Sequence, residues 1–136
     1  MGTKPTTLTN ALRDYTFAYL ITADEAGHAH AVPVTPIPSA ESLIINRPGR
    51  RTLANVARVP VATLVWPPVK SDGYSLIVDG DVNNEDGALR IAATRAVLNR
   101  TAPAADPDVT AASPVPDGSC AADCVVLRLP ASAESA

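Results

Sequence analysis

Thirteen prolines in 136 residues constrain this chain more than any other feature of its sequence. Each proline lacks a backbone donor and breaks a helix, so the prolines argue against an all-helical bundle. Several apolar segments between the prolines are short and rich in β-branched residues, which is typical of strands. Length and apolar content fit one domain over residues 1–136, and we therefore expect a single, mainly β domain.

A β-hairpin is the clearest local pattern. Residues 17–23 form a compact apolar run, and residues 24–27 form a turn in which Gly27 supplies a positive φ. Residues 28–36 then alternate between two faces, as a returning strand does. Prolines in and just after this strand cannot donate to a ladder, so one of its sides should lack regular pairing.

The remaining elements are predicted from the spacing of apolar residues and from the residues that begin or end helices and strands. Residues 7–15 predict a short helix capped by Thr7, and Leu53, Val56 and Ala57 give a second helix an apolar stripe that ends before Pro60. Further strands are expected at residues 43–46, 61–66, 74–82, 88–100 and 124–129. Segment 88–100 is rich in alanine and would allow a helix, but its position after a tight turn favours a strand.

These elements predict a six- to seven-stranded antiparallel sheet with two short helices. Strands that follow one another by hairpins are antiparallel, and closing them into a barrel removes exposed edges. Residues 1–6 and 130–136 are expected to fray, and the proline-rich stretch 101–118 is expected to be a surface loop.

Charge and composition narrow the function classes. The net charge of −3 does not suit non-specific nucleic-acid binding, which needs a broad basic surface. No apolar run approaches the roughly 18 residues of a membrane helix, and the run at residues 17–22 is too short for a signal peptide. A soluble cytoplasmic protein is expected, with no membrane or nucleic-acid partner. Twenty-four alanines, with nine arginines against two lysines, indicate a GC-rich bacterial genome.

The order of the motifs resembles the pyridoxamine 5′-phosphate oxidase-like FMN-binding split-barrel family, within the flavin and deazaflavin oxidoreductases. The resemblance spans residues 8–82: the hairpin with Gly-His-Ala-His-Ala-Val-Pro-Val at 27–34, an Arg-Arg-Thr helix start at 50–52, and Val-Ala-Thr-Leu-Val-Trp at 61–66. It implies a split β-barrel that forms a homodimer. It also implies FMN, or alternatively the deazaflavin coenzyme F-420, in a groove at the dimer interface.

The implied activity is hydride transfer to or from a small organic substrate. The alternative is a non-catalytic protein that uses the same barrel to hold a flavin or haem. True pyridoxamine phosphate oxidases carry a paired Arg and His near the C-terminus, whereas here no histidine follows His30 and Arg128 is the only basic residue after position 124. Oxidation of pyridoxamine phosphate itself is therefore not expected.

The strongest candidate site is the arginine cluster before the second helix. A helix start offers unpaired amides and a positive dipole end, and arginines add bidentate bonds to phosphate. The resemblance implies that this segment holds the cofactor phosphate; the alternative is a solvated loop with Thr52 as an ordinary N-cap. The predicted phosphate-binding residues are Arg47, Arg50, Arg51 and Thr52.

A second group of residues is expected along the isoalloxazine ring. The resemblance places the ring along Val34, Thr35 and Pro36, where prolines would leave backbone groups free for a ligand. The alternative is an edge strand protected by proline against aggregation. Trp66 could offer the ring an apolar wall, although a lone tryptophan at a strand end more often packs in a core.

No metal site and no catalytic residue are predicted. His28, His30, Cys120 and Cys124 match the arithmetic of a zinc site, but about 90 residues separate the two pairs. Free thiols or a local bridge are the expected states of the cysteines. No nucleophile or acid–base motif stands out, and hydride chemistry would belong to the cofactor.

Overall fold

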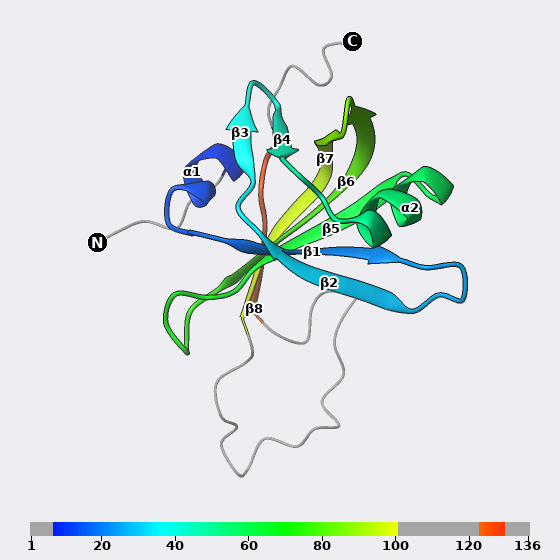
Figure 1. Cartoon of the computed structure of the whole chain (residues 1–136). Coiled ribbons are helices and arrows are strands. Elements are labelled where there is room, and N and C mark those ends of the chain that lie inside the picture. The colour runs from blue at the N-terminus through cyan, green and yellow to red at the C-terminus, as the bar shows by residue number, and fades with distance from the viewer. Residues whose placement is uncertain (1–6, 101–122, 130–136) are drawn as a thin grey trace.

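The computed structural model describes residues 7–100 and 123–129, which form one antiparallel sheet with two short helices (Figure 1). The predicted mainly β fold is confirmed. The expected frayed ends and proline-rich loop lie outside the described residues. The described elements are α1 (Leu8–Leu12), β1 (Ala18–Ala23), β2 (Ala29–Val34), β3 (Ile37–Ser39), β4 (Ser42–Ile45), α2 (Arg50–Arg58), β5 (Val61–Trp66), β6 (Ser75–Glu85), β7 (Ala88–Arg100) and β8 (Asp123–Val126).

The sheet is an open barrel whose two edges are neighbours in the chain. Its strand order is β2-β1-β5-β6-β7-β4-β3, so β2 and β3 lie at opposite ends of the sheet. Only Thr35 and Pro36 separate these two strands (Figure 1). Three peptide links span at most about 11 Å, so the sheet must curl until its edges approach each other. Within the described ranges no ladder joins β2 to β3, and the barrel is split at this point.

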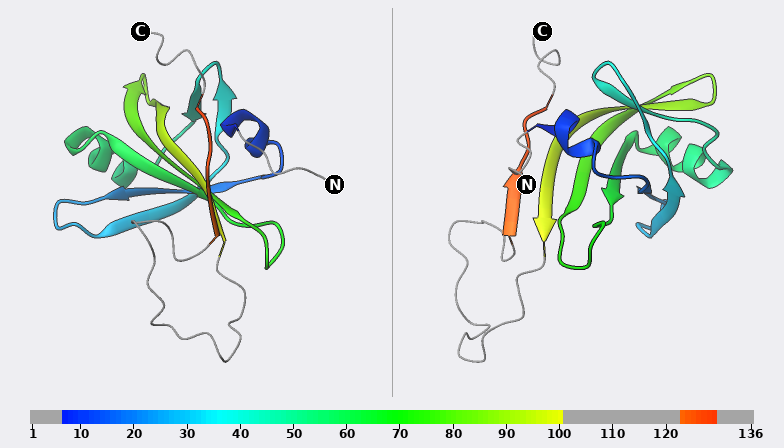
Figure 2. Two further views of the ribbon diagram at one scale, coloured as in Figure 1. Left: turned by 180° about the vertical axis from the view of Figure 1, so that it is seen from behind. Right: turned by 90° about the vertical axis from the view of Figure 1, so that its left-hand side faces the viewer.

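Strand β7 is the hub of the sheet. It pairs with β6 along most of its length, with β4 over residues 89–92 and with β8 over its last four residues (Figure 2). A bulge between Asp79 and Gly80 interrupts the β6–β7 ladder. A Cβ at Gly80 would meet Ile91 Cγ2 at 2.6 Å, so the close approach of the two strands requires glycine there.

The core fills the inside of the barrel. Alternate residues of β5 and β6 are buried, as period-two geometry requires of a sheet with one inward face. The two helices lie at opposite sides of the molecule (Figure 2). The largest fully buried apolar side chains are Leu20, Ile45, Leu64, Leu76, Leu89, Ile91 and Val78.

Most predicted elements are confirmed, with three corrections to the strands. The described part holds eight strands rather than six or seven, because β3 was not expected. Pro38 lies inside β3, which is tolerated because β3 is an edge strand. Strand β6 continues to Glu85, three residues past its predicted end, and β8 begins at Asp123 and ends at Val126 rather than spanning 124–129. The alanine-rich segment 88–100 is a strand, as expected.

The helices also differ in detail from the prediction. Thr7 caps α1 through an Asn10 N–H···Oγ1 bond of 3.2 Å, as predicted, but α1 ends at Leu12. The apolar stripe predicted for α2 is partly wrong, because Ala57 is exposed. None of the helices in residues 7–100 and 123–129 is long and apolar enough to span a membrane.

Candidate functional site

Two arginines lie in the first turn of α2, and no acidic residue of that turn balances their charge. The helix begins at Arg50 and has Gly49 as its N-cap, so Arg50 and Arg51 stand in its first turn rather than in the preceding loop. Gly49 contributes no side-chain capping bond, and the first turn holds no acidic residue. Both arginine side chains are exposed. Cations at this end of a helix oppose its dipole, so the arrangement costs free energy when no anion is bound.

The first turn also offers backbone donors. The first intrahelical bond runs from the Leu53 N–H to the Gly49 carbonyl at 3.0 Å. The N–H groups of residues 50–52 precede it and have no partner within the helix. Among the residues that the structure describes, none of Arg47, Arg50 and Arg51 makes an ion pair. Free amides and unpaired guanidinium groups at one helix end form a surface suited to a phosphate.

Arg47 lies three residues before the first residue of α2 and has an unusual backbone conformation. Its φ of 55° lies in the left-handed region, which residues other than glycine rarely adopt. Together with Asn46 it lines a cavity of about 390 Å³ whose other wall is the tip of the β6–β7 hairpin, at Asp86 and Gly87. The predicted residues Arg50, Arg51 and Thr52 do not line this cavity.

Thr52 faces inward rather than toward a ligand. It is only 1 % exposed and lies on the buried face of α2 with Asn55 and Val56. The alternative that made Thr52 an ordinary N-cap is wrong, because the N-cap is Gly49. From this position the Thr52 backbone N–H can still belong to the first turn, whereas its side chain belongs to the interior.

Two hydrogen bonds fasten the second half of α2 to β1. Asn55 Nδ2 donates to Thr22 Oγ1 at 3.0 Å in the interior. Arg58 Nη2 donates to the Ala23 carbonyl at 2.6 Å at the surface. Neither bond was predicted from the sequence. A polar residue, Asn55, next to the apolar Val56 of the helix stripe was the one feature that could have indicated a buried partner.

The residues predicted along the ring lie at the split of the barrel. Val34 ends β2 and is half-buried, Thr35 is exposed, and Pro36 is half-buried. β2 is an edge strand, so one of its sides has no ladder partner within the described sheet, as predicted. Trp66 is only 2 % exposed and belongs to the core, which favours the packing interpretation over a wall for a ligand.

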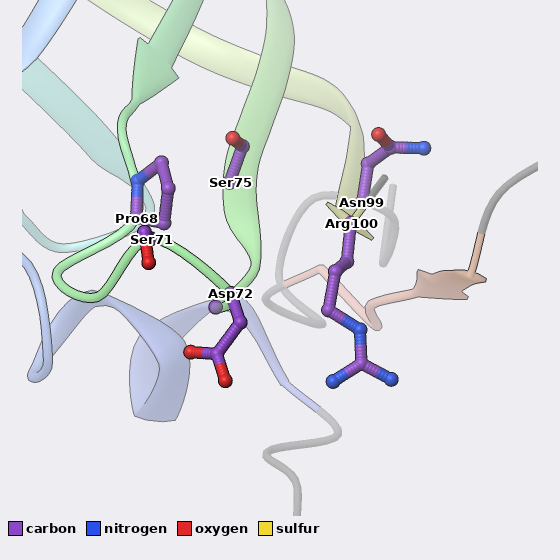
Figure 3. A pocket seen from close by; sticks show the side chains of 7 residues that line it. Pro68, Ser71, Asp72, Ser75, Asn99 and Arg100 are labelled. Atoms are coloured by element: carbon purple, nitrogen blue, oxygen red, sulfur yellow. The ribbon is translucent and has the colours of Figure 1, made fainter. Parts of the chain in front are cut away.

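Two further hollows lie away from these residues. The first, of about 310 Å³, lies between the β5–β6 loop and the ends of β6 and β7 (Figure 3). The side chains of Asp72 and Arg100 point the same way in this view (Figure 3). The Arg100 guanidinium lies over the Tyr74 ring, 4.7 Å from its centre. None of the predicted site residues lines this hollow.

The second hollow, of about 350 Å³, lies on the outward face of β1, β5 and β6. Thr63 Oγ1 donates to Asp79 Oδ1 there at 2.6 Å. Arg95 Nη1 lies 3.7 Å from Asp79 Oδ2, so the carboxylate has both a hydrogen-bond donor and a cation beside it.

The histidines and cysteines do not gather into a metal site in the described ranges. His28 is exposed and contacts the Asp24 carboxylate at 3.6 Å, and its backbone N–H bond to that carboxylate lowers the pKa of Asp24. Cys124 lies in β8 and is disulfide-bonded, while Cys120 lies outside the described residues. Residues 7–100 and 123–129 hold no group of three or more potential metal ligands.

Comparison with known proteins gives close relatives in sequence and a distant one in structure. No family model matches the chain. Two uncharacterized proteins, from Mycobacterium bovis and Mycobacterium tuberculosis, are each 38 % identical to it over 139 aligned positions, covering 90 % of this chain and 93 % of theirs.

A crystal structure from Listeria innocua, of a protein named provisionally as a pyridoxamine 5′-phosphate oxidase, superposes with a TM-score of 0.55. It is 11 % identical and covers 67 % of this chain and 94 % of its own, so the likeness concerns the fold alone. The fold is therefore a barrel of the pyridoxamine 5′-phosphate oxidase-like type, and the chain belongs to the same family as the two mycobacterial proteins.

Proposed function

We propose that this chain is a cytoplasmic oxidoreductase that uses FMN or the deazaflavin coenzyme F-420 and transfers a hydride to or from a small organic substrate. The fold is compatible with this function, because the Listeria innocua protein of the same fold is named for an oxidase. Fold alone does not establish an activity, so the proposal depends on the site.

The observation that carries the proposal is the positive, uncapped start of α2. Two exposed arginines in a first turn without an acidic residue destabilise the free helix. Each unfavourable charge at a helix end costs roughly 0.3–1 kcal/mol. A bound phosphate ester would reverse that sign, since its charge would meet the helix dipole, the free amides and both guanidinium groups at once.

The residues present fit the phosphate end of such a cofactor. Arg50 and Arg51 would hold the phosphate oxygens, with the amides of residues 50–52 completing the cradle. When bound, FMN or the deazaflavin supplies the hydride chemistry. The backbone of the exposed residue Thr35, where the barrel is split, would lie along the polar edge of the ring.

A second copy of the chain would complete the ring site. The outward side chains of Tyr19, Val65 and Ile77 are cross-strand neighbours on β1, β5 and β6 and form an apolar row. Tyr19 is 40 % exposed, and its ring meets that of Phe17 at 5.4 Å in an edge-to-face contact. Outward faces of antiparallel sheets are usually polar, so an apolar row indicates a partner. Two-fold pairing of identical faces is the commonest arrangement, and we propose a homodimer.

Titration of the purified protein with FMN, riboflavin and F-420 tests the cofactor assignment. Losing a charge-assisted hydrogen bond costs roughly 1.5–3 kcal/mol, so we expect each single alanine variant to weaken FMN binding by about tenfold to a hundredfold. Arg50→Ala with Arg51→Ala should weaken it further, to the point of abolishing binding. Riboflavin, which lacks the phosphate, should bind wild type and variant alike. The matched control is Arg95→Ala, an exposed arginine on the sheet.

Equal affinity for FMN and riboflavin in the wild type would refute the phosphate cradle, and so would an unchanged affinity of the double variant for FMN. Turnover is measured separately, by reducing the bound cofactor and following its reoxidation by small organic acceptors. Tight binding without turnover would identify the non-catalytic alternative.

A further inference from the structure

The buried polar side chains of the described residues gather at one place. Three such side chains are buried: Thr22, Thr52 and Asn55, which are 4 %, 1 % and 5 % exposed. Two of them lie on α2, and the third lies on β1, the strand against which α2 packs. Elsewhere the described core is apolar, so this concentration of polar groups is specific to the junction that carries the arginine helix.

The Asn55–Thr22 bond is not required for stability alone. A buried hydrogen-bonded pair adds little net free energy, and two apolar side chains of similar shape can replace it at nearly no cost. Such a pair does restrict geometry, because a hydrogen bond weakens steeply when its angle or length changes. An apolar contact would allow α2 to slide or rotate against β1, whereas the amide and the hydroxyl fix one arrangement.

Helix α2 is short and lacks a side-chain cap, so its position depends on contacts with the sheet. Nine residues are fewer than the roughly 12–15 that an isolated helix needs, and the first turn has neither a side-chain cap nor an acidic residue. Val56 is its one buried apolar side chain, with Leu53 half-buried. Both hydrogen bonds to β1 come from Asn55 and Arg58, in the second half of the helix. Neither bond comes from the first turn, where Thr52 packs inward and the Arg50 and Arg51 side chains remain exposed.

We propose that Asn55 is a positioning residue: its bond to Thr22 holds α2 in the orientation that aims Arg50, Arg51 and the first-turn amides at the cofactor phosphate. The inference rests on the proposed function for its ligand. Asn55 lies five residues after Arg50, about 7.5 Å along the helix axis, and acts through the helix rather than by touching the phosphate.

The main test is the double variant Thr22→Val with Asn55→Leu, which exchanges both polar partners for apolar groups. We expect the variant to fold and to bind riboflavin within about twofold of wild type. Its affinity for FMN should fall about tenfold, so that the preference for the phosphate ester largely disappears. Thr22→Ser on its own keeps the accepting hydroxyl and should retain the wild-type preference for FMN. Thr94→Val is the matched control, because it removes a hydroxyl bond to the Asp79 carbonyl, between β7 and β6, that does not involve α2.

A merely structural role would lower the affinity for both flavins together, or for neither. An unchanged FMN preference in a folded double variant would therefore overturn the inference. Should the double variant not fold, Asn55→Ala removes the donor without leaving a buried amide unpaired and serves the same comparison.

Hydrogen exchange of the α2 amides separates this inference from the proposed function. Loss of the Asn55 bond should speed exchange in α2 by tenfold or more while leaving β5 and β6 protected. If wild type binds FMN and riboflavin equally, the proposed function fails, and the exchange rates still decide whether Asn55 anchors the helix. Equal exchange in wild type and double variant would overturn the anchoring itself.

Discussion

Reversing the charge at Arg50 should make the free protein more stable and the flavin complex weaker. Arg50 is exposed in the first turn of α2, where a cation opposes the helix dipole. Arg50→Glu replaces an unfavourable charge by a favourable one, a change of roughly 0.6–2 kcal/mol in unfolding free energy at low salt. Arginine and glutamate have nearly equal helix propensities, so the intrinsic preference of the backbone does not confound the comparison.

The thermal midpoint measures the first effect. For a chain of this length, 1 kcal/mol corresponds to roughly 3–5 °C, so we expect the midpoint of Arg50→Glu to rise by about 2–10 °C in dilute buffer. At about 1 M salt, where the screening length is roughly 3 Å, most of this gain should vanish. FMN affinity should fall by more than the tenfold to hundredfold expected of an alanine variant, because the new carboxylate would also repel the phosphate.

Arg58 provides the matched control on the same helix. It lies in the last turn, where a cation is favourable, and it donates to the Ala23 carbonyl. Arg58→Glu should therefore lower the midpoint. A lower midpoint for Arg50→Glu at low salt would refute the argument that the first turn is electrostatically strained. An unchanged FMN affinity would refute the phosphate assignment.

Three further expectations concern the sheet and its surroundings. Gly80→Ala should destabilise the protein by about 1–3 kcal/mol or more in urea unfolding, because the new methyl would lie 2.6 Å from Ile91 Cγ2 and 2.7 Å from a β7 backbone oxygen; unaltered stability would contradict the observed strand spacing. Burial, and then the Asp14 carboxylate, raise the pKa of Tyr15, so the stability that its neutral phenol contributes is fully present below pH 10 and is lost as the pH rises through the raised pKa. Tyr15→Phe should reduce the loss of stability above about pH 10. Identical stability profiles against pH for the variant and the wild type would contradict this role of Tyr15. Tyr19→Lys should convert a 28 kDa particle in light scattering, about twice the chain mass of 14.1 kDa, into a monomer, whereas a wild-type mass near that of one chain would refute the dimer.

The hairpin and the long strands were predictable because their signals are local. The β1–β2 pair follows from strict alternation and from a glycine at the turn, where Gly27 has a φ of 87°. The inward position of Trp66 could also have been read from parity, since it shares a strand face with Ala62 and Leu64, both buried.

Non-local pairing accounts for most of the errors in the fold. Nothing near Pro38 predicts a strand, and β3 exists because β4 lies beside it as a ladder partner. The β6–β7 hairpin likewise extends to Glu85, opposite Ala88, because pairing continues to the tight turn at Asp86 and Gly87. In both cases the deciding partner is another strand, which composition within one segment does not reveal.

The candidate site divides in the same way between local and non-local information. Three arginines within five residues are visible in the sequence, but their relation to the helix start is not. The N-cap lies at Gly49 rather than at Thr52, whose hydroxyl could have accepted a bond from a first-turn amide. Thr52 is drawn inward by the hydrophobic face that it shares with Val56. Tertiary burial thus overrides a local capping preference and leaves the first-turn amides without a side-chain partner.

That override has a physical consequence for how α2 can work. A threonine cap would satisfy a first-turn amide from within the chain and compete with an external anion for it. With the threonine buried and a glycine in the capping position, the donors stay available, and the stability that a cap would have supplied must come from elsewhere. The bonds from Asn55 to Thr22 and from Arg58 to Ala23 are the observed substitutes, and both act at the end of the helix away from the arginines. A helix held by its second half and left unsatisfied at its first turn is suited to gain stability when an anion binds, which is the property that a phosphate cradle requires.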